Sequence, residues 1–179
     1  MSTKQPWHGI VKILSIKHWK DGRVVWENNN VTNLLHTQGE EFIVKALFTG
    51  GKTSTVIPDV YYIGLDDRET VALGDTMDSI FVEPIGNGYS RQPIASSGDF
   101  TPVLQDNHWA AQSPLLVFNA SVSGTGWGPV QNLFLTDDPA LDGHLISTAK
   151  IGKILSLGAG ESVTLQLTMS LLDCAPSTS

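Results

Sequence analysis

The sequence predicts a mainly β protein: an antiparallel β-sandwich or jelly-roll-like barrel with one short α-helix near the N-terminus. Charged residues make up 16% of the 179 residues, below the roughly 25% of typical soluble domains. Ser, Thr, Asn and Gly take their place and favour strands and turns. Many short apolar segments alternate with turn signals, and one segment alone has helical spacing. An immunoglobulin-like sandwich is the open alternative, because these patterns do not separate the two topologies.

The first 30 residues predict a β-hairpin. Residues 9–19 are rich in Ile and Val, Asp21-Gly22 is a strong turn signal, and residues 24–27 form the return strand, which ends at three consecutive asparagines. Trp19 and Trp26 flank the turn and are placed to pair across it. The hairpin either reaches out as a docking arm or completes the domain's own sheet. Residues 31–174 then form the sandwich domain, and 175–179 a frayed tail.

One helix is predicted over about residues 33–48, before Gly50-Gly51. Asn33 and Thr37 are alternative N-caps, and Thr37 has a capping-box partner in Glu40. The apolar residues at helical spacing, which we expect to pack on a sheet, are Leu35, Phe42, Ile43, Ala46 and Leu47.

The middle of the chain predicts one strand, residues 60–65, and then an irregular region to about residue 112 with a helical turn within 73–80. A stretch this long is functional, flexible or held by a partner. Its first acidic side chains, Asp66, Asp67 and Glu69, do not have the spacing of an EF-hand and fit a solvated loop better than a calcium site.

The final third predicts strands again, over residues 115–122, 130–135, 144–148, 150–157 and 162–172. The last of these alternates between apolar and polar residues from Ser162 to Leu171, which is typical of a strand with one buried and one wet face. The apolar face consists of Val163, Leu165, Leu167, Met169 and Leu171.

The net charge of −7 is unevenly distributed. Residues 53–149 contain twelve acidic and two basic residues, a net −10, whereas the rest of the chain contains nine basic and six acidic residues, a net +3. This distribution argues against nucleic-acid binding, which needs clustered Lys and Arg. It allows an electropositive docking end and an acidic outer face, or acidic loops that only keep the protein soluble. No apolar run reaches the roughly 20 residues of a membrane span, and we expect synthesis and assembly in a cytoplasm.

The sequence offers no recognisable catalytic device. Cys174 is the only cysteine, so neither an intrachain disulfide nor a cysteine zinc site is expected. The five histidines have no metal-ligand spacing, and a Gly-x-Ser-x-Gly elbow and a P-loop are both missing. We therefore expect no metal, no cofactor and no enzyme activity. A small hydrolase without a familiar motif is the remaining alternative.

Two tryptophans are candidates for ligand contact. Trp127 stands between glycines and before Pro129, which predicts an exposed ring, and Trp109 is a second candidate. Exposed aromatic rings stack on sugars, but they anchor protein interfaces or fill cores at least as often.

Three blocks of the sequence resemble a family of small structural proteins of tailed bacteriophages. The first is Asn33-Leu34-Leu35 entering QGEEFIVKALF. The second runs from Tyr62-Ile63-Gly64-Leu65 through Asp66-Asp67-Arg68 to the segment from Glu83 to Arg91, EPIGNGYSR. The third is Gly128-Pro129-Val130 leading into Leu133-Phe134-Leu135-Thr136.

The resemblance implies a non-enzymatic virion protein, most of all a capsid decoration (cement) protein that bridges and stabilises capsomers on the phage head. Its partners would be the major capsid protein and copies of itself, arranged as a homotrimer on local threefold axes. The alternative is a tail or fibre protein that binds a host-surface glycan. No nucleic-acid or membrane partner is expected.

The interface is predicted on the basic N-terminal region and on the long acidic loop, which a neighbouring subunit would order. The candidate interface residues are Trp7, Lys12, Trp19, Arg23, Asp66, Asp67, Arg68, Tyr89, Arg91 and Trp127.

Overall fold

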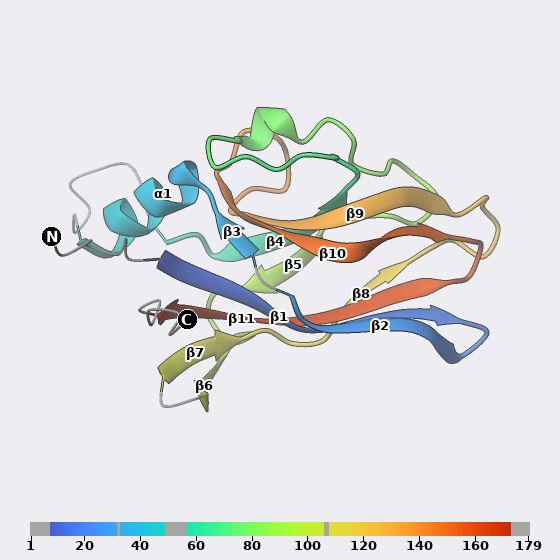
Figure 1. Cartoon of the computed structure of the whole chain (residues 1–179), viewed down its shortest axis with the longest axis horizontal. Coiled ribbons are helices and arrows are strands. Elements are labelled where there is room, and N and C mark those ends of the chain that lie inside the picture. Colours follow the sequence, from blue (N-terminus) through green and yellow to red (C-terminus); the bar gives the residue numbers. More distant parts are fainter. Residues whose placement is uncertain (1–7, 32, 49–56, 106–107, 173–179) are drawn as a thin grey trace, which may run out of the picture.

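The computed structural model describes residues 8–31, 33–48, 57–105 and 108–172, and these form two antiparallel sheets (Figure 1). The first sheet has the strand order β2-β1-β11-β7-β6, and β8 pairs with β11 further along the same edge as β7. Its strands are β1 (His8–Lys20), β2 (Arg23–Val31), β6 (Thr101–Gln105), β7 (His108–Gln112), β8 (Leu116–Asn119) and β11 (Ser162–Leu172). A mainly β, antiparallel fold is thus confirmed.

The second sheet has the order β3-β10-β9-β4-β5 and lies over the first (Figure 1). Its strands are β3 (Asn33–Leu35), β4 (Val60–Asp66), β5 (Gln92–Ala95), β9 (Trp127–Thr136) and β10 (Leu145–Leu157). Helix α1 (Thr37–Phe48) packs at one end, and Met77–Ser79 form a 3₁₀ turn, η1. None of the described helices is long and apolar enough to cross a membrane.

Side chains from both sheets form one continuous hydrophobic core. The predicted apolar face of β11 is buried at Val163, Leu165 and Leu167. The predicted polar face is not exposed throughout, because Thr168 is 2% exposed. Phe42 of α1 joins the same core, so the apolar stripe of the helix packs on the sheets as expected.

The N-terminal hairpin is part of the domain. Asp21 and Gly22 both have positive φ, 49° and 71°, which is the geometry of a tight two-residue turn. Strand β1 pairs with β11 along its length, from His8 opposite Leu172 onward. The hairpin therefore completes the domain's own sheet, and a docking role for it stays a prediction.

Two details of this hairpin also differ from the prediction. The asparagines do not end β2, which continues to Val31; Asn28 Nδ2 donates to the Ile151 carbonyl at 2.9 Å and joins β2 to β10. Trp26 lies opposite His18, not Trp19.

The predicted helix begins too early. Residues 33–35 form β3, which pairs with β10 and buries Leu35. Glu40 N donates to the His36 carbonyl at 2.9 Å, so His36 holds the N-cap position and Thr37 is the first helical residue. Strand pairing with β10 has overridden the local signal at Asn33.

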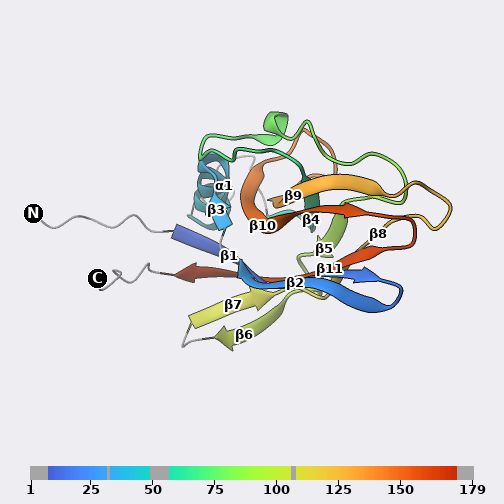
Figure 2. The ribbon, with the colours of Figure 1, turned by 45° about the vertical axis from the view of Figure 1, so that its right-hand side comes forward.

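The predicted irregular region is shorter than expected. Strands β5, β6 and β7 occupy its second half, and the helical turn predicted within residues 73–80 is confirmed by η1. The strands predicted at 144–148 and 150–157 are one strand, β10, with an irregular register between Lys150 and Leu155. The loop that remains, residues 67–91, lies along one side of the molecule, as both ribbon views show (Figures 1 and 2).

Candidate functional site

Loop 67–91, the predicted interface, is attached to its own chain at three places. The first is a buried ion pair at the end of β4. Arg68 Nε donates to Asp66 Oδ1 and its Nη2 to Asp66 Oδ2, both at 3.1 Å, and this bidentate geometry is the strongest form of such a pair. Arg68 Nη1 reaches across the loop to Asp75 Oδ2 at 2.9 Å.

Two strands and the start of α1 complete this polar cluster. Asn132 Nδ2 on β9 donates to Asp66 Oδ1 at 2.9 Å and to the Arg68 carbonyl at 2.7 Å. Arg68 Nη2 also donates to Thr148 Oγ1 on β10 at 3.2 Å, and that oxygen lies 2.8 Å from His36 Nε2. The ring of His36 is fully buried, and this burial lowers its pKa.

The second attachment joins Glu83, Tyr89 and Arg91. The Tyr89 hydroxyl donates to Glu83 Oε1 at 2.7 Å and accepts from the Leu65 amide at 2.8 Å. Arg91 holds the same carboxylate with Nε and Nη2, at 3.0 Å and 2.7 Å, and its guanidinium lies 5.0 Å from the centre of the Phe134 ring. Burial and the nearby Glu83 charge raise the pKa of Tyr89, so the hydroxyl stays protonated.

The third attachment is apolar. Met77 and Ile80 of the loop form a small buried cluster with Phe134 and Leu145. The loop is therefore held by contacts within its own chain, and its ordering by a neighbouring subunit stays a prediction. Asp67 is held as well, since Gln131 Nε2 donates to both its carbonyl and its Oδ1 at 3.2 Å.

Trp127 does not have the exposed ring that its glycine neighbours predicted. The side chain is 6% exposed, Nε1 donates to the Asn119 carbonyl at 3.1 Å, and the ring meets Tyr89 edge-on at 5.4 Å. Gly126 has a φ of 84°, and a Cβ there would lie 1.8 Å from the Leu157 carbonyl oxygen. The glycine thus allows close approach of two backbones and does not mark an exposed loop.

Two basic residues of the hairpin are paired with carboxylates. Lys17 pairs with Glu27 at 3.4 Å and Lys20 with Glu161 at 2.9 Å. Glu161 also lies 2.8 Å from His18 Nε2. The pKa of Glu161 is lowered to about 2, first by the hydrogen bond from Lys20. The electropositive docking end that the sequence allowed stays a prediction.

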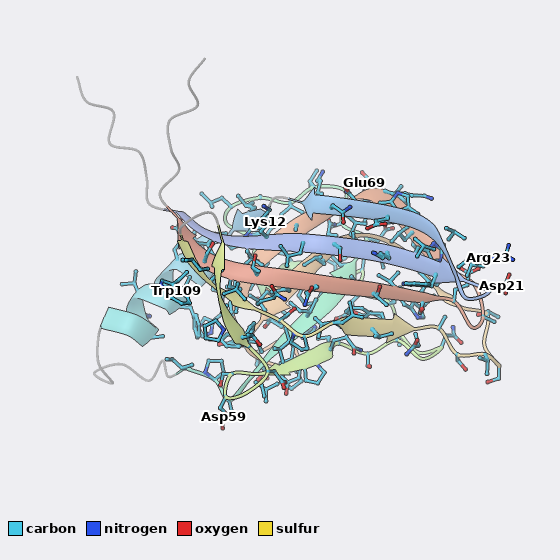
Figure 3. The ribbon with its side chains drawn as sticks, turned by 90° about the horizontal axis from the view of Figure 1, so that it is seen from below. Lys12, Asp21, Arg23, Asp59, Glu69 and Trp109 are labelled. Carbon is cyan, nitrogen blue, oxygen red and sulfur yellow. The ribbon has the colours of Figure 1, made fainter. Side chains whose placement is uncertain are left out.

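The remaining predicted interface residues are spread over the first sheet. Lys12 is half-buried, and it lies on the outward face of β1 because its neighbours Val11 and Ile13 face the core. Arg23 is exposed at the hairpin turn (Figure 3). Trp19 Nε1 donates to Thr164 Oγ1 on β11 at 2.9 Å. Trp7 lies outside the described residues. The structure thus joins Asp66 to Arg68, and Tyr89 to Arg91 and Trp127, but the nine described residues of the set do not share one surface.

An exposed apolar pair lies on the β6–β7 hairpin, and the sequence predicted only one of its members, Trp109. Leu104 and Trp109 lie directly opposite each other and are 62% and 70% exposed. They share a face of the sheet with Ala111, which pairs with Met169 on the core-facing side of β11. On this hairpin, the side of the sheet that elsewhere faces the core is therefore exposed to solvent. Asp106-Asn107, between the two strands, is the sequence signal for this hairpin.

A second exposed apolar set lies on loops at the other end of the molecule. Ile85 and Val122 are 92% and 85% exposed. Their loops meet where Ser121 N donates to the Asn87 carbonyl at 2.7 Å, and Val122 lies beside Gly160 in the β10–β11 turn. The Lys20–Glu161 pair joins that turn to the first hairpin, and Figure 3 places Arg23 of that hairpin and Trp109 at opposite ends.

Chemistry-bearing residues are otherwise dispersed. Among the described residues, no group of three or more His, Cys, Asp and Glu side chains is placed to hold a metal ion. A hollow of ≈ 260 Å³ is lined by Gln38, Thr76, Met77, Asp78, Leu141, Asp142 and Gly143. Comparison with protein-family models and with curated proteins yields no match, so neither assigns the chain to a family.

Proposed function

We propose that this chain is a non-enzymatic structural protein of a tailed-phage virion, in particular a capsid decoration (cement) protein that bridges and stabilises capsomers. The observation that supports this most is the pair of exposed apolar sets at the two ends of one body: Leu104 with Trp109, and Ile85 with Val122. A bridge needs two contact surfaces on a body that keeps their separation fixed.

The surfaces have the chemistry of protein contacts. Tryptophan is among the residues that contribute most to binding free energy when an interface buries it, and an exposed Trp–Leu pair on an edge hairpin is available for that. The three attachments of loop 67–91 hold the loop that carries Ile85 before any partner binds, so less conformational entropy is lost on binding.

In this proposal the two facing sheets form a jelly-roll-like sandwich, and three copies sit on local threefold axes of the head. The partners are the major capsid protein and neighbouring copies. The protein is made in the host cytoplasm and ends on the outer surface of the phage head.

The proposal is tested by adding purified protein to heads that lack it and measuring bound copies by sedimentation. We expect Trp109→Ala and Ile85→Ser each to weaken binding by roughly tenfold or more, since each removes one contact of the bridge. Ile154→Ser, at another residue that is 60% exposed, is the matched control and should bind normally. Wild-type binding by both end variants, or a particle reconstruction with this chain only on the tail, would reject the bridging role.

The second candidate is a tail or fibre protein that binds a host-surface glycan. Trp109 favours it, because a ring that is 70% exposed is available for stacking on a sugar; Trp127, being buried, no longer supports it. A glycan array tests this directly. An array without signal, together with normal adsorption of Trp109→Ala phage, would exclude glycan binding.

A further inference from the structure

We propose that His36 is an acid-sensitive latch: its neutral imidazole holds residues 67–80 against β10, and protonation of the ring releases them. This inference does not depend on the virion role, since it rests on the polar cluster alone.

The latch follows from the direction of two hydrogen bonds at one hydroxyl. Arg68 Nη2 lies 3.2 Å from Thr148 Oγ1, and because a guanidinium only donates, the oxygen is the acceptor. The Thr148 hydroxyl proton is then free to point at His36 Nε2, 2.8 Å away. We assign His36 Nε2 as the acceptor of that proton, which is the tautomer of the neutral ring that carries its own proton on Nδ1. In this arrangement the ring nitrogen that faces Thr148 is unprotonated.

Protonation of Nε2 breaks the relay. Two donors, His36 and Arg68, would then point at the same oxygen, and the Thr148 proton would lose its acceptor. A second positive charge would also stand beside Arg68 in a site where His36 is fully buried. A buried polar group that loses its partner destabilises the state that buries it, and this shifts the local equilibrium of the loop toward the open form.

The groups around the ring do not offset this effect. From the loop, Asp75 and the backbone of Leu73 and Ala72 favour the charged ring, whereas Arg68 opposes it. Asp66 of β4 is held by Arg68, and β9 and β10 contribute the neutral Asn132 and Thr148. Burial is the largest influence and lowers the pKa of His36. Nδ1 has no well-aligned hydrogen bond of its own.

The segment that would be released is defined by its contacts near the ring. Thr37 N donates to the Leu73 carbonyl at 3.0 Å, Ala72 N to Asp75 Oδ2 at 2.9 Å, and Arg68 Nη1 to the same Asp75 oxygen. The first of these bonds ties the loop to α1, and the other two hold residues 68–75 of the loop together. Their loss frees the chain up to Met77, which covers Phe134 and Leu145 in the small apolar cluster.

Hydrogen exchange tests the latch, with rates expressed relative to the unprotected amide at each pH. In the wild type, protection of the Thr37 and Ala72 amides should fall on going from about pH 7.5 to about pH 5. Protection should fall by up to tenfold per pH unit over the range in which His36 is protonated in the open loop but not in the latched loop. The Leu165 amide in β11 should keep its protection. In His36→Gln, whose amide oxygen can still accept from Thr148 but cannot titrate, the loop amides should not respond to pH.

His144→Gln is the matched control, since His144 is a partly exposed histidine outside the cluster, and it should behave as the wild type does. If His36→Gln does not fold, an NMR titration of the His36 ring in the wild type decides the matter: a pKa below the ordinary 6.5 supports the latch. A pKa at or above 6.5, or an equal pH response in wild type and His36→Gln, would overturn it.

Discussion

The carboxylate of Asp66 and the guanidinium of Arg68 face each other inside the protein, where both side chains are almost completely shielded from solvent. Removing one member of such a pair leaves an uncompensated buried charge, which is strongly destabilising, whereas removing both costs less. The pair also bonds to three other parts of the chain: Arg68 to Asp75 of the loop and to Thr148 of β10, and Asp66 to Asn132 of β9.

Arg68→Met should therefore lower the free energy of unfolding by about 3–5 kcal/mol, measured by urea denaturation. Adding Asp66→Asn should recover part of this loss, because the buried charge is gone. Lys17→Met, which breaks the half-exposed pair with Glu27, is the control and should change stability by at most about 1 kcal/mol. Equal losses in Arg68→Met and Lys17→Met would mean that the buried pair has no special role.

Trp127 and Trp109, the two tryptophans first considered for ligand contact, should differ in how much their substitution lowers the free energy of unfolding. Trp127→Ala empties a site in the core and should cost about 3–5 kcal/mol. Trp109→Ala removes a ring that is mostly in solvent and should stay within about 0.5 kcal/mol. Thermal or urea unfolding followed by circular dichroism measures both, and a large loss in Trp109→Ala would show that the ring is covered in solution.

Gly126→Ala should lower the free energy of unfolding by more than the positive φ of this residue alone predicts. Gly126 and Gly86 have similar positive φ values, 84° and 73°, but a Cβ at Gly86 would meet nothing within 4 Å, whereas one at Gly126 would strike the Leu157 carbonyl. Gly86→Ala should cost about 1–2 kcal/mol from backbone strain, and Gly126→Ala clearly more. The difference between the unfolding free energies of the two variants measures the cost of the steric clash at Gly126.

Stability should fall in acid partly through Glu161. Its pKa is about 2 in the folded chain against an ordinary 4.5, so the unfolded state binds a proton first as the pH falls. The stabilisation is complete above about pH 4.5 and is lost progressively down to about pH 2. Urea unfolding across this window should show a smaller pH slope for Glu161→Gln than for wild type. Glu27→Gln serves as the surface control, and an unchanged slope in Glu161→Gln would contradict the assignment.

The sequence predicts strands well where a local pattern and the final pairing agree. The alternation of β11 and the Asp21-Gly22 turn are of this kind, because each depends on neighbouring residues alone. Residues 33–35 were misassigned since pairing with β10, more than a hundred residues away, decides their state. Strands β5 to β7 are short, and two of them contain a proline, so their local signal is weak.

The candidate site was less predictable for a related reason. Asp66, Arg68, Tyr89 and Arg91 were predicted as interface residues, because a charged loop residue suggests a partner outside the chain. The structure gives them partners within their own chain. Their partners, Asn132, Thr148 and Phe134, come from β9 and β10. Nothing in the local sequence marks these residues as neighbours of the loop. Burial of Trp127 was missed for the same reason, since the backbone of β10 is what Gly126 approaches.

The pairing of β1 with β11 sets the order in which the protein can be completed. Strand β1 is made well before β11, its neighbour in the first sheet, because more than a hundred residues separate the two strands along the chain. Until β11 emerges, β1 and its hairpin have no sheet to join, and contacts this distant along the chain form slowly. A nascent chain would thus leave the apolar strand β1 without this partner until β11 is made, a state prone to aggregation. A chaperone that shields β1 until then would raise the yield of folded protein.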